Sequence, residues 1–227
     1  MSDELNKFNE AYTGNRPDVQ QLIPDNVQRV LDCGCSVGAL GEEIAKRPNK
    51  PEVCGIELDE QTAQIAKSKL DRVIIGNLDT IDFAEHFQKG YFDCIIFSDV
   101  LEHTQDPWGI LKNAMPFLNN DGFVIISIPN IRHYTTICNL IFRDYWPYRE
   151  RGLHDKTHLR FFTLKSIKEL CENAGLQIQR LERNYRIYER PHYRNRFAKY
   201  LAIPFLRGFL VFQYLIVAKK RGPHGGE

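Results

Sequence analysis

Residues 32–38, Asp-Cys-Gly-Cys-Ser-Val-Gly, place an acid and two glycines between two apolar segments, a composition suited to binding a polar ligand. The segment before them, 27–31, predicts a short strand, and 37–46 has the periodicity of a helix. Gly34 and Gly38 fit a tight turn between the two, because a side chain at either position would obstruct the backbone and an approaching ligand. The first N–H groups of the helix could then donate to polar atoms of that ligand.

The spacing of the glycines separates two classes of nucleotide-binding enzyme. The dinucleotide fingerprint has the pattern G-x-G-x-x-G. Starting from Gly34, this pattern would need glycines at 36 and 39, where the chain has Ser36 and Ala39. The spacing therefore disfavours a nicotinamide-dependent oxidoreductase.

The same stretch resembles motif I of the class I S-adenosylmethionine (SAM) dependent methyltransferases, hydrophobic-hydrophobic-D-x-G-C-G-x-G. Asp32, Gly34, Cys35 and Gly38 match this motif, and Ser36 replaces its middle glycine. The resemblance extends through most of the chain. P-N-x-R-H at 129–133 and D-K-T-H-L-R-F-F-T at 155–163 are similar to a branch close to the ubiquinone-pathway O-methyltransferases, which often acts in sugar or cell-surface pathways. The resemblance to this family implies a SAM site at the glycine turn.

Polar side chains follow the next two predicted strands, 52–57 and 72–75. Glu57 lies 25 positions after Asp32 (57 − 32 = 25), and its carboxylate could accept hydrogen bonds from both vicinal hydroxyls of a ribose. A lone Glu at a strand end is more often simply solvated, but its place one unit after the glycine turn favours the ribose. Members of the family usually have an Asp after the third strand that meets the adenine amino group. Here Asn77 can still accept a hydrogen bond, and Asp79 could restore the charge.

A fourth predicted strand, 91–97, runs into residues 98–103, Ser-Asp-Val-Leu-Glu-His, which match the family's stretch ending in L-E-H. Upstream, an amphipathic helix over 4–12 and a second helix starting at Pro17 resemble a segment that covers the cofactor. This implies that Arg16 pairs with the SAM carboxylate beside Tyr12, and a surface arginine with a packing tyrosine is the equal alternative. The expected cofactor site comprises Arg16, Asp32, Gly34, Cys35, Ser36, Gly38, Glu57, Leu58, Asn77, Leu78, Ser98 and Asp99.

Methyl transfer from SAM needs an aligned acceptor, because the sulfonium methyl is already activated. Positioning can supply roughly 7–11 kcal/mol, and a base that takes the acceptor's proton about 10²–10⁴-fold. The histidines that could be this base are His103, His133, His154 and His158. A structural role is commoner for any single histidine. We rank His103 first as a catalytic residue, because it follows the fourth strand, and His158 second.

A metal site is a further interpretation of His154 and His158. Their i, i+4 spacing beside Asp155 would suit a metal if they lay on a helix. Lys156 and the loop-like composition around it argue against a helix there. We therefore expect no metal.

Strands and helices alternate five times up to residue 129, which predicts a parallel sheet covered on both faces and a ligand at its carboxyl edge. A turn is expected at 119–123, helices at 131–142 and 164–174, and two last strands at 176–181 and 212–218. With the resemblance, this gives an α/β fold: a Rossmann-like, doubly wound, mostly parallel seven-stranded sheet with an antiparallel last strand. We expect one domain over 1–227, with cofactor-covering helices in 1–26 and substrate-side insertions at 131–163 and 183–208.

Composition indicates an ordinary globular protein, with 43% hydrophobic and 26% charged residues. The six cysteines include no C-x-x-C pair, which favours structural, reduced thiols in a reducing cytosol. The first ten residues are polar, so we expect no signal peptide. The apolar run 201–217 is interrupted by Pro204, Arg207, Gly208 and Gln213 and is too short to span a membrane. We therefore expect a cytoplasmic location, and no sequence feature indicates an oligomeric state.

The segment 183–200 carries six basic residues, one acid and four tyrosines, in a chain whose net charge is only +1. A solvated helix and loop would explain it. Alternatively, it holds an anionic acceptor or makes peripheral contact with an anionic membrane surface. Nucleic acid would fit the charge, but no base-reading motif accompanies it, so none is expected.

The sequence as a whole predicts a SAM-dependent methyltransferase acting on a hydroxyl oxygen of a small-molecule or glycan acceptor. The alternative is a methyltransferase-like binding module without catalytic activity. Such a module would be expected to lose Asp32, Gly34 or Glu57, and all three are present.

Overall fold

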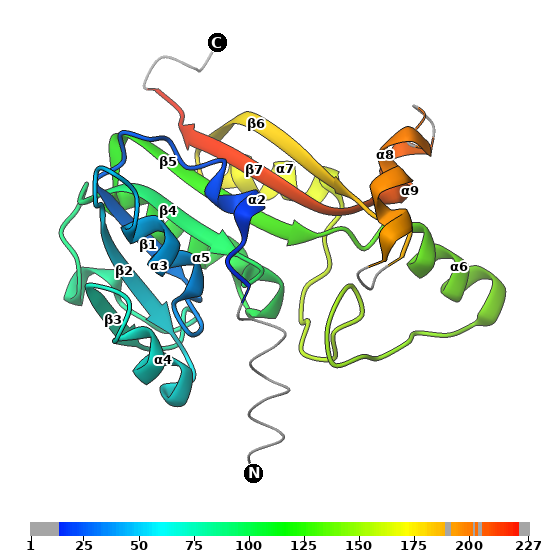
Figure 1. Cartoon of the computed structure of the whole chain (residues 1–227), viewed down its shortest axis with the longest axis horizontal. Coiled ribbons are helices and arrows are strands. Elements are labelled where there is room, and N and C mark those ends of the chain that lie inside the picture. The colour runs from blue at the N-terminus through cyan, green and yellow to red at the C-terminus, as the bar shows by residue number, and fades with distance from the viewer. Residues whose placement is uncertain (1–13, 189–191, 202, 204–205, 223–227) are drawn as a thin grey trace.

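Seven strands form one mixed sheet in the order β3-β2-β1-β4-β5-β7-β6 (Figure 1). The computed structural model describes residues 14–188, 192–201, 203 and 206–222. The strands are β1 (Arg29–Cys33), β2 (Glu52–Glu57), β3 (Arg72–Ile75), β4 (Phe92–Ser98), β5 (Leu118–Pro129), β6 (Leu176–Tyr185) and β7 (Val211–Lys220). The first five are parallel, and β7 pairs antiparallel with both β5 and β6. The expected Rossmann-like sheet with its antiparallel last strand is confirmed.

Helices cover both faces of this sheet, as expected. The described helices are α2 (Pro17–Gln20), α3 (Ala39–Ala45), α4 (Glu60–Ala66), α5 (Pro107–Ala114), α6 (Tyr134–Arg143), α7 (Leu164–Asn173), α8 (Ala198–Leu201) and α9 (Arg207–Leu210). Alternate residues of the strands pack into two hydrophobic cores, one on each face of the sheet. Val30 and Ile96 pack with α2 and α3. Leu31 and Ile95 pack with α5 and α7. Because both faces are covered, the middle of β4 is buried without interruption.

Capping residues set several helix ends. Asp106 accepts a 3.0 Å hydrogen bond from the Gly109 N–H at the start of α5. Thr163 forms a capping box with Ser166 at the start of α7. Gly175, with φ 73°, follows the end of that helix in the left-handed conformation.

Several boundaries differ from the expectation; for example, β6 continues to Tyr185 where the strand was expected to end at 181. The predicted turn at 119–123 is the irregular beginning of β5, where the register passes from Phe92 opposite Leu118 to Cys94 opposite Phe123. The helix predicted from residue 131 starts at Tyr134, because the side chain of His133 caps its first turn. The helix expected at 4–12, with Tyr12, lies outside the described residues.

Among the residues that the structure describes, no helix is long and apolar enough to cross a membrane.

Candidate active site

The turn after β1 is shaped by its glycines. The N–H groups of Gly34 and Cys35 both donate to the carbonyl of Ile56 in β2, at 2.8 and 3.0 Å. Gly34 has φ 79°, and a Cβ there would lie 2.6 Å from a methyl group of Val100. At Gly38, with φ 74°, a Cβ would lie 3.2 Å from the backbone of Ala66. The turn needs both glycines because neighbouring parts of the chain pack directly against it.

Glu57 joins this turn to the start of α4. Its Oε2 accepts a 2.7 Å hydrogen bond from the Ser36 N–H, and its Oε1 accepts one of 3.0 Å from the Asp59 N–H. A carboxylate offers about four acceptor positions, so two remain for ribose hydroxyls. Ser36 itself has φ 49°, a left-handed conformation that suits the glycine it replaces better than a serine.

Asp32, at the end of β1, is only 2% exposed. Burial raises the pKa of its carboxyl group to about 7, and the charge of Glu57 adds to the shift while Arg16 opposes it. A buried acid at the base of the glycine turn is thus poised to change protonation near neutral pH.

Arg16 lies across the carboxyl ends of β4 and β5. Its guanidinium donates to the hydroxyl groups of Ser98 and Ser127, at 2.6 and 2.8 Å, and pairs with Asp18 and Asp99. The structure therefore brings together three predicted cofactor residues, Arg16, Ser98 and Asp99. In this arrangement Arg16 is engaged by two carboxylates, so pairing with a cofactor carboxylate requires an exchange of partners.

Asn77 and Asp79, which follow β3, make different contacts. Asn77 accepts a 2.9 Å hydrogen bond from the Asp79 N–H and so shapes its own turn. Asp79 accepts hydrogen bonds from the N–H groups of Gln105 and Asp106, which ties this turn to the start of α5. Its carboxylate is used in that link. Leu78 is buried, whereas Leu58 after β2 is 66% exposed and offers apolar surface beside Glu57.

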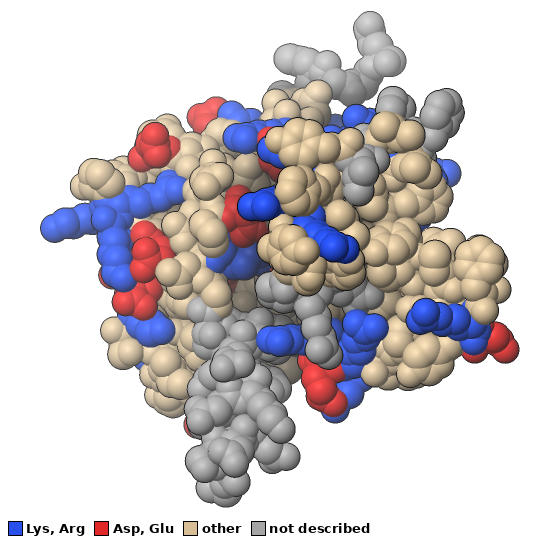
Figure 2. Space-filling model, turned by 45° about the vertical axis from the view of Figure 1, so that its right-hand side comes forward, with Lys and Arg blue, Asp and Glu red and all other residues tan. Residues whose placement is uncertain are grey.

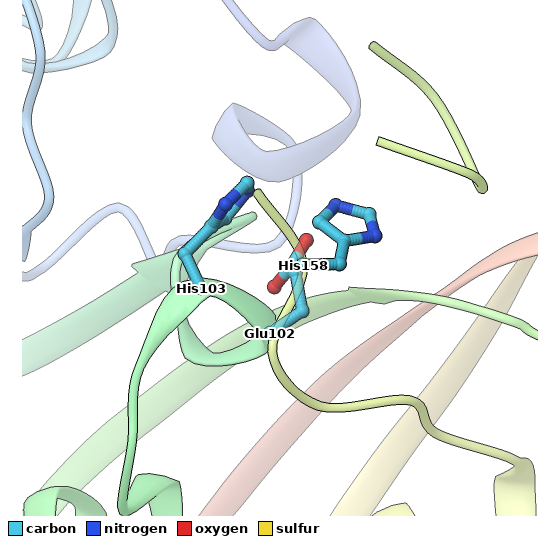
Figure 3. A group of neighbouring side chains, drawn as sticks. All are labelled: Glu102, His103 and His158. Carbon is cyan, nitrogen blue, oxygen red and sulfur yellow. The ribbon is translucent and has the colours of Figure 1, made fainter. Parts of the chain in front are cut away.

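His103 and His158 lie together, with ring centroids 4.6 Å apart and planes at 75° (Figure 3). His103 and Glu102 belong to the short helical turn η2 (Leu101–His103) after β4. His158 comes from the facing segment, held there because the carbonyl of Glu102 accepts from the N–H groups of Leu159 and Arg160. The two ranked candidates for the base are thus neighbours at the carboxyl edge of the sheet.

Glu102 completes this cluster and was not assigned a role from the sequence. It is 1% exposed, its Oε2 has no hydrogen-bond partner among the described residues, and burial beside Asp99 raises its pKa well above the usual range. Figure 3 shows its carboxylate between the two imidazoles. One ligand atom from each of Glu102, His103 and His158 lies within 4.8 Å of the others, a donor set that a divalent cation could also use.

Thr157 orients His103 and was also missed. Its hydroxyl donates to Asp155 at 2.6 Å and lies 2.9 Å from Nδ1 of His103. Burial lowers the pKa of His103, although Asp155 and Asp99 act in the opposite direction. Burial, with His103 beside it, lowers the pKa of His158 to about 4. Both rings are therefore neutral near pH 7.

The other two histidines have structural environments. His133 is fully buried, with Nδ1 2.9 Å from Thr135 Oγ1 and Nε2 2.8 Å from the Arg186 carbonyl. His154 is also buried, with Nε2 3.1 Å from Thr136 Oγ1. The segment 154–158 forms turns, so His154 and His158 do not share a helix face.

Proteins of known function or known structure that are similar to this chain include several methyltransferases. Ubiquinone biosynthesis O-methyltransferases are similar in sequence: that of Neisseria meningitidis is 28% identical over 157 residues, 66% of this chain and 64% of the relative, and that of Acinetobacter baylyi is 24% identical over 67% and 64%. The match thus spans less than two thirds of those relatives' length.

Solved structures share the fold. A SAM-dependent methyltransferase from Archaeoglobus fulgidus aligns with TM-score 0.66 and 19% identity, covering 95% of this chain and 99% of that one. An S-adenosylmethionine dependent methyltransferase from Mesorhizobium loti aligns with TM-score 0.61 and 16% identity, covering 90% and 96%. A family model described as a methyltransferase domain matches residues 8–181, which include the glycine turn, Glu57 and the Glu102–His103–His158 cluster. The chain belongs to this methyltransferase family, as the motif around Asp32 predicted.

Proposed function

We propose that this protein is an enzyme that transfers a methyl group from SAM to a hydroxyl oxygen of a small-molecule or glycan acceptor. SAM is the methyl donor and occupies the carboxyl edge of the sheet, with its ribose at Glu57. The observation that carries the proposal is the pair of neutral imidazoles, His103 and His158, beside a buried carboxyl group at that edge. The similarity to ubiquinone biosynthesis O-methyltransferases supports an oxygen acceptor.

Hydrogen bonding around Thr157 supports Nε2 of His103 as the nitrogen that takes the proton. The single hydroxyl hydrogen of Thr157 points to Asp155, so its oxygen accepts from Nδ1 of His103. In the tautomer that we propose, Nδ1 carries the ring hydrogen and Nε2 is the basic nitrogen. Asp155 and Thr157 act as positioning residues that fix this tautomer.

The spacing of the cluster suits an acceptor hydroxyl. One ligand atom from each of the three residues lies within 4.8 Å of the others, so one bound atom could contact all three at about 2.7–3.2 Å. An oxygen placed among them can contact Glu102, His103 and His158 together. The oxygen–carbon bond forms as the carbon–sulfur bond breaks, its electron pair stays on sulfur, and the hydroxyl proton moves to His103.

The test combines binding with turnover. Calorimetry should show binding of SAM and S-adenosylhomocysteine but not of NAD. Incubation with SAM and separate sets of phenols, nucleotide sugars and primary amines should then release S-adenosylhomocysteine with a hydroxyl acceptor. Methylation of amines alone would overturn oxygen as the acceptor atom, and binding without turnover of any class would overturn catalysis.

A further inference from the structure

The helix α6 buries polar side chains and exposes apolar ones, the reverse of a helix that packs against a hydrophobic core. Its buried residues are polar, Thr136 and Asn139. Its exposed residues near the end are apolar: Leu140, Ile141 and Phe142, the last 78% exposed. Exposing large apolar side chains together on one helix is unfavourable in water, so this end of α6 has the composition of a surface that contacts an apolar phase.

A second exposed segment projects from the same edge of the molecule. Among the residues of this segment whose side chains the structure describes (193–200, 203 and 206), the exposed apolar and aromatic ones are Tyr193, Phe197, Tyr200, Ile203 and Leu206. Basic side chains lie over the rings: Arg194 over Tyr193 at 5.6 Å, Arg196 over Phe197 at 4.7 Å and Lys199 over Tyr200 at 5.0 Å. The cations and the rings are therefore presented side by side.

Residues 130–134, which lead into α6, bind the chain on both sides of this segment. Nε2 of His133 lies 2.8 Å from the carbonyl of Arg186, and Tyr134 donates to the carbonyl of Ile187. At the other end, Asn130 donates to the carbonyl of Gly208 at 3.0 Å. Figure 1 accordingly shows α6, α8 and α9 at one end of the sheet.

The charged residues of the segment that follows Glu189 have one sign. No Asp or Glu occurs between Glu189 and Glu227, an interval with many Lys and Arg residues. Figure 2, with this end turned forward, shows blue side chains spread between broad tan areas. Near an anionic leaflet each basic side chain contributes about fivefold to the partition coefficient, and aromatic and aliphatic side chains enter the interface.

We propose that the exposed end of α6 and the described residues 193–200, 203 and 206 form a docking surface for an anionic lipid membrane. A lipid surface fits better than nucleic acid, because Leu140, Ile141, Ile203 and Leu206 add aliphatic area that stacking on bases does not use. The surface follows the carboxyl end of β5, the same edge of the sheet as His103. Docking thus turns the candidate active site toward the membrane. This inference goes beyond the proposed methyl transfer and does not depend on which acceptor is used.

Vesicle flotation tests the proposal with the full chain. Parent protein should bind phosphatidylcholine vesicles containing phosphatidylglycerol at low salt, and binding should fall with neutral vesicles or high salt. The variant R194Q/R196Q/K199Q should lose on the order of 100-fold in partitioning. The matched control K67Q/K89Q/K112Q removes three exposed charges elsewhere and should bind like the parent.

The apolar contribution is tested with I141S/F142S, which should weaken binding to anionic vesicles while thermal stability and SAM affinity stay at parental values. Failure of the parent to float with anionic vesicles at low salt overturns the proposal, as does an equal loss in the matched control. Single-stranded RNA that binds and is not displaced by anionic vesicles would assign the surface to nucleic acid instead. Concentration-dependent dimers abolished by I141S/F142S, with no flotation, would assign it to self-association.

Discussion

The backbone N–H of Ser36 donates a 2.7 Å hydrogen bond to Oε2 of Glu57, which connects the glycine turn after β1 with the end of β2. The carboxylate is fixed on its other side by the Asp59 N–H. A side chain held at both oxygens loses little further freedom when a ribose binds, so its hydrogen bonds to ligand are well preorganised.

Replacing Glu57 with alanine should therefore weaken SAM binding. The lost charge-assisted hydrogen bonds are worth about 1.5–3 kcal/mol, or roughly 10–100-fold in affinity. Calorimetry measures this directly. Asp59→Ala is the control, because it removes only the cap that accepts from Thr62 at the start of α4. It should lower stability by about 1 kcal/mol and leave affinity nearly unchanged. Unchanged affinity in folded Glu57→Ala would rule out the ribose role.

A bulky side chain at position 36 should block the cofactor. Ser36 is partly exposed and has φ 49°. Ser36→Leu should abolish SAM binding while the thermal stability of the unliganded protein changes little. Ser36→Gly relieves the left-handed strain, so it should bind SAM and raise stability by about 1 kcal/mol, or roughly 2–4 °C. If Ser36→Leu loses stability as much as binding, the turn is only a packing feature.

Removing the proposed base should affect turnover and not cofactor binding. His103→Ala should lower kcat by about 10²–10⁴-fold with SAM affinity nearly intact. Thr157→Val keeps the ring but removes its 2.9 Å contact at Nδ1, so a smaller loss, about tenfold, is expected. Steady-state kinetics and calorimetry separate the two effects. A His103→Ala enzyme with parental kcat would transfer the role to His158 or show that no base is needed.

Much of the proposed cofactor site could be predicted because its signals are local. The glycines of the turn, Asp32 and Glu57 each sit at a strand end, and parallel strands bring their carboxyl ends to one edge. Strand β4 could be identified from the apolar run 94–97. The order of the predicted strands along the sequence was enough to predict that these residues lie at the same edge of the sheet.

The acceptor side depends on contacts that no local pattern encodes. His103 and Thr157 are 54 positions apart, and they meet because backbone N–H groups of Leu159 and Arg160 bind the Glu102 carbonyl. Periodicity predicted α6 but not that its polar side faces the protein. Likewise, nothing local distinguishes buried His133 from His103.

Stability of the unliganded protein should fall as pH rises toward neutrality. The pKa of Asp32 is raised from 3.8 to about 7 by burial, then by Glu57, and is opposed by Arg16. The folded state therefore keeps a proton that the unfolded chain releases, so this stability is full below about pH 4 and is lost as pH rises through 7. A shift of about three units corresponds to roughly 4 kcal/mol. Urea unfolding at several pH values should show this loss in the parent and a smaller one in Asp32→Asn. Identical slopes for the two proteins would contradict the assignment.

Chelation should leave methyl transfer intact, because the proposed route places the acceptor's proton on Nε2 of His103 without a metal. Glu102, His103 and His158 also form a donor set that a divalent cation could use, so the two routes can be separated at this cluster. Enzyme treated with EDTA and dialysed should retain its parental kcat. Added zinc should inhibit it, since a metal bound to Nε2 removes the lone pair that takes the proton. His158→Ala should relieve that inhibition by removing one of the three donors. Loss of turnover on chelation, restored by magnesium or zinc, would instead make this cluster a catalytic metal site and overturn the proton route.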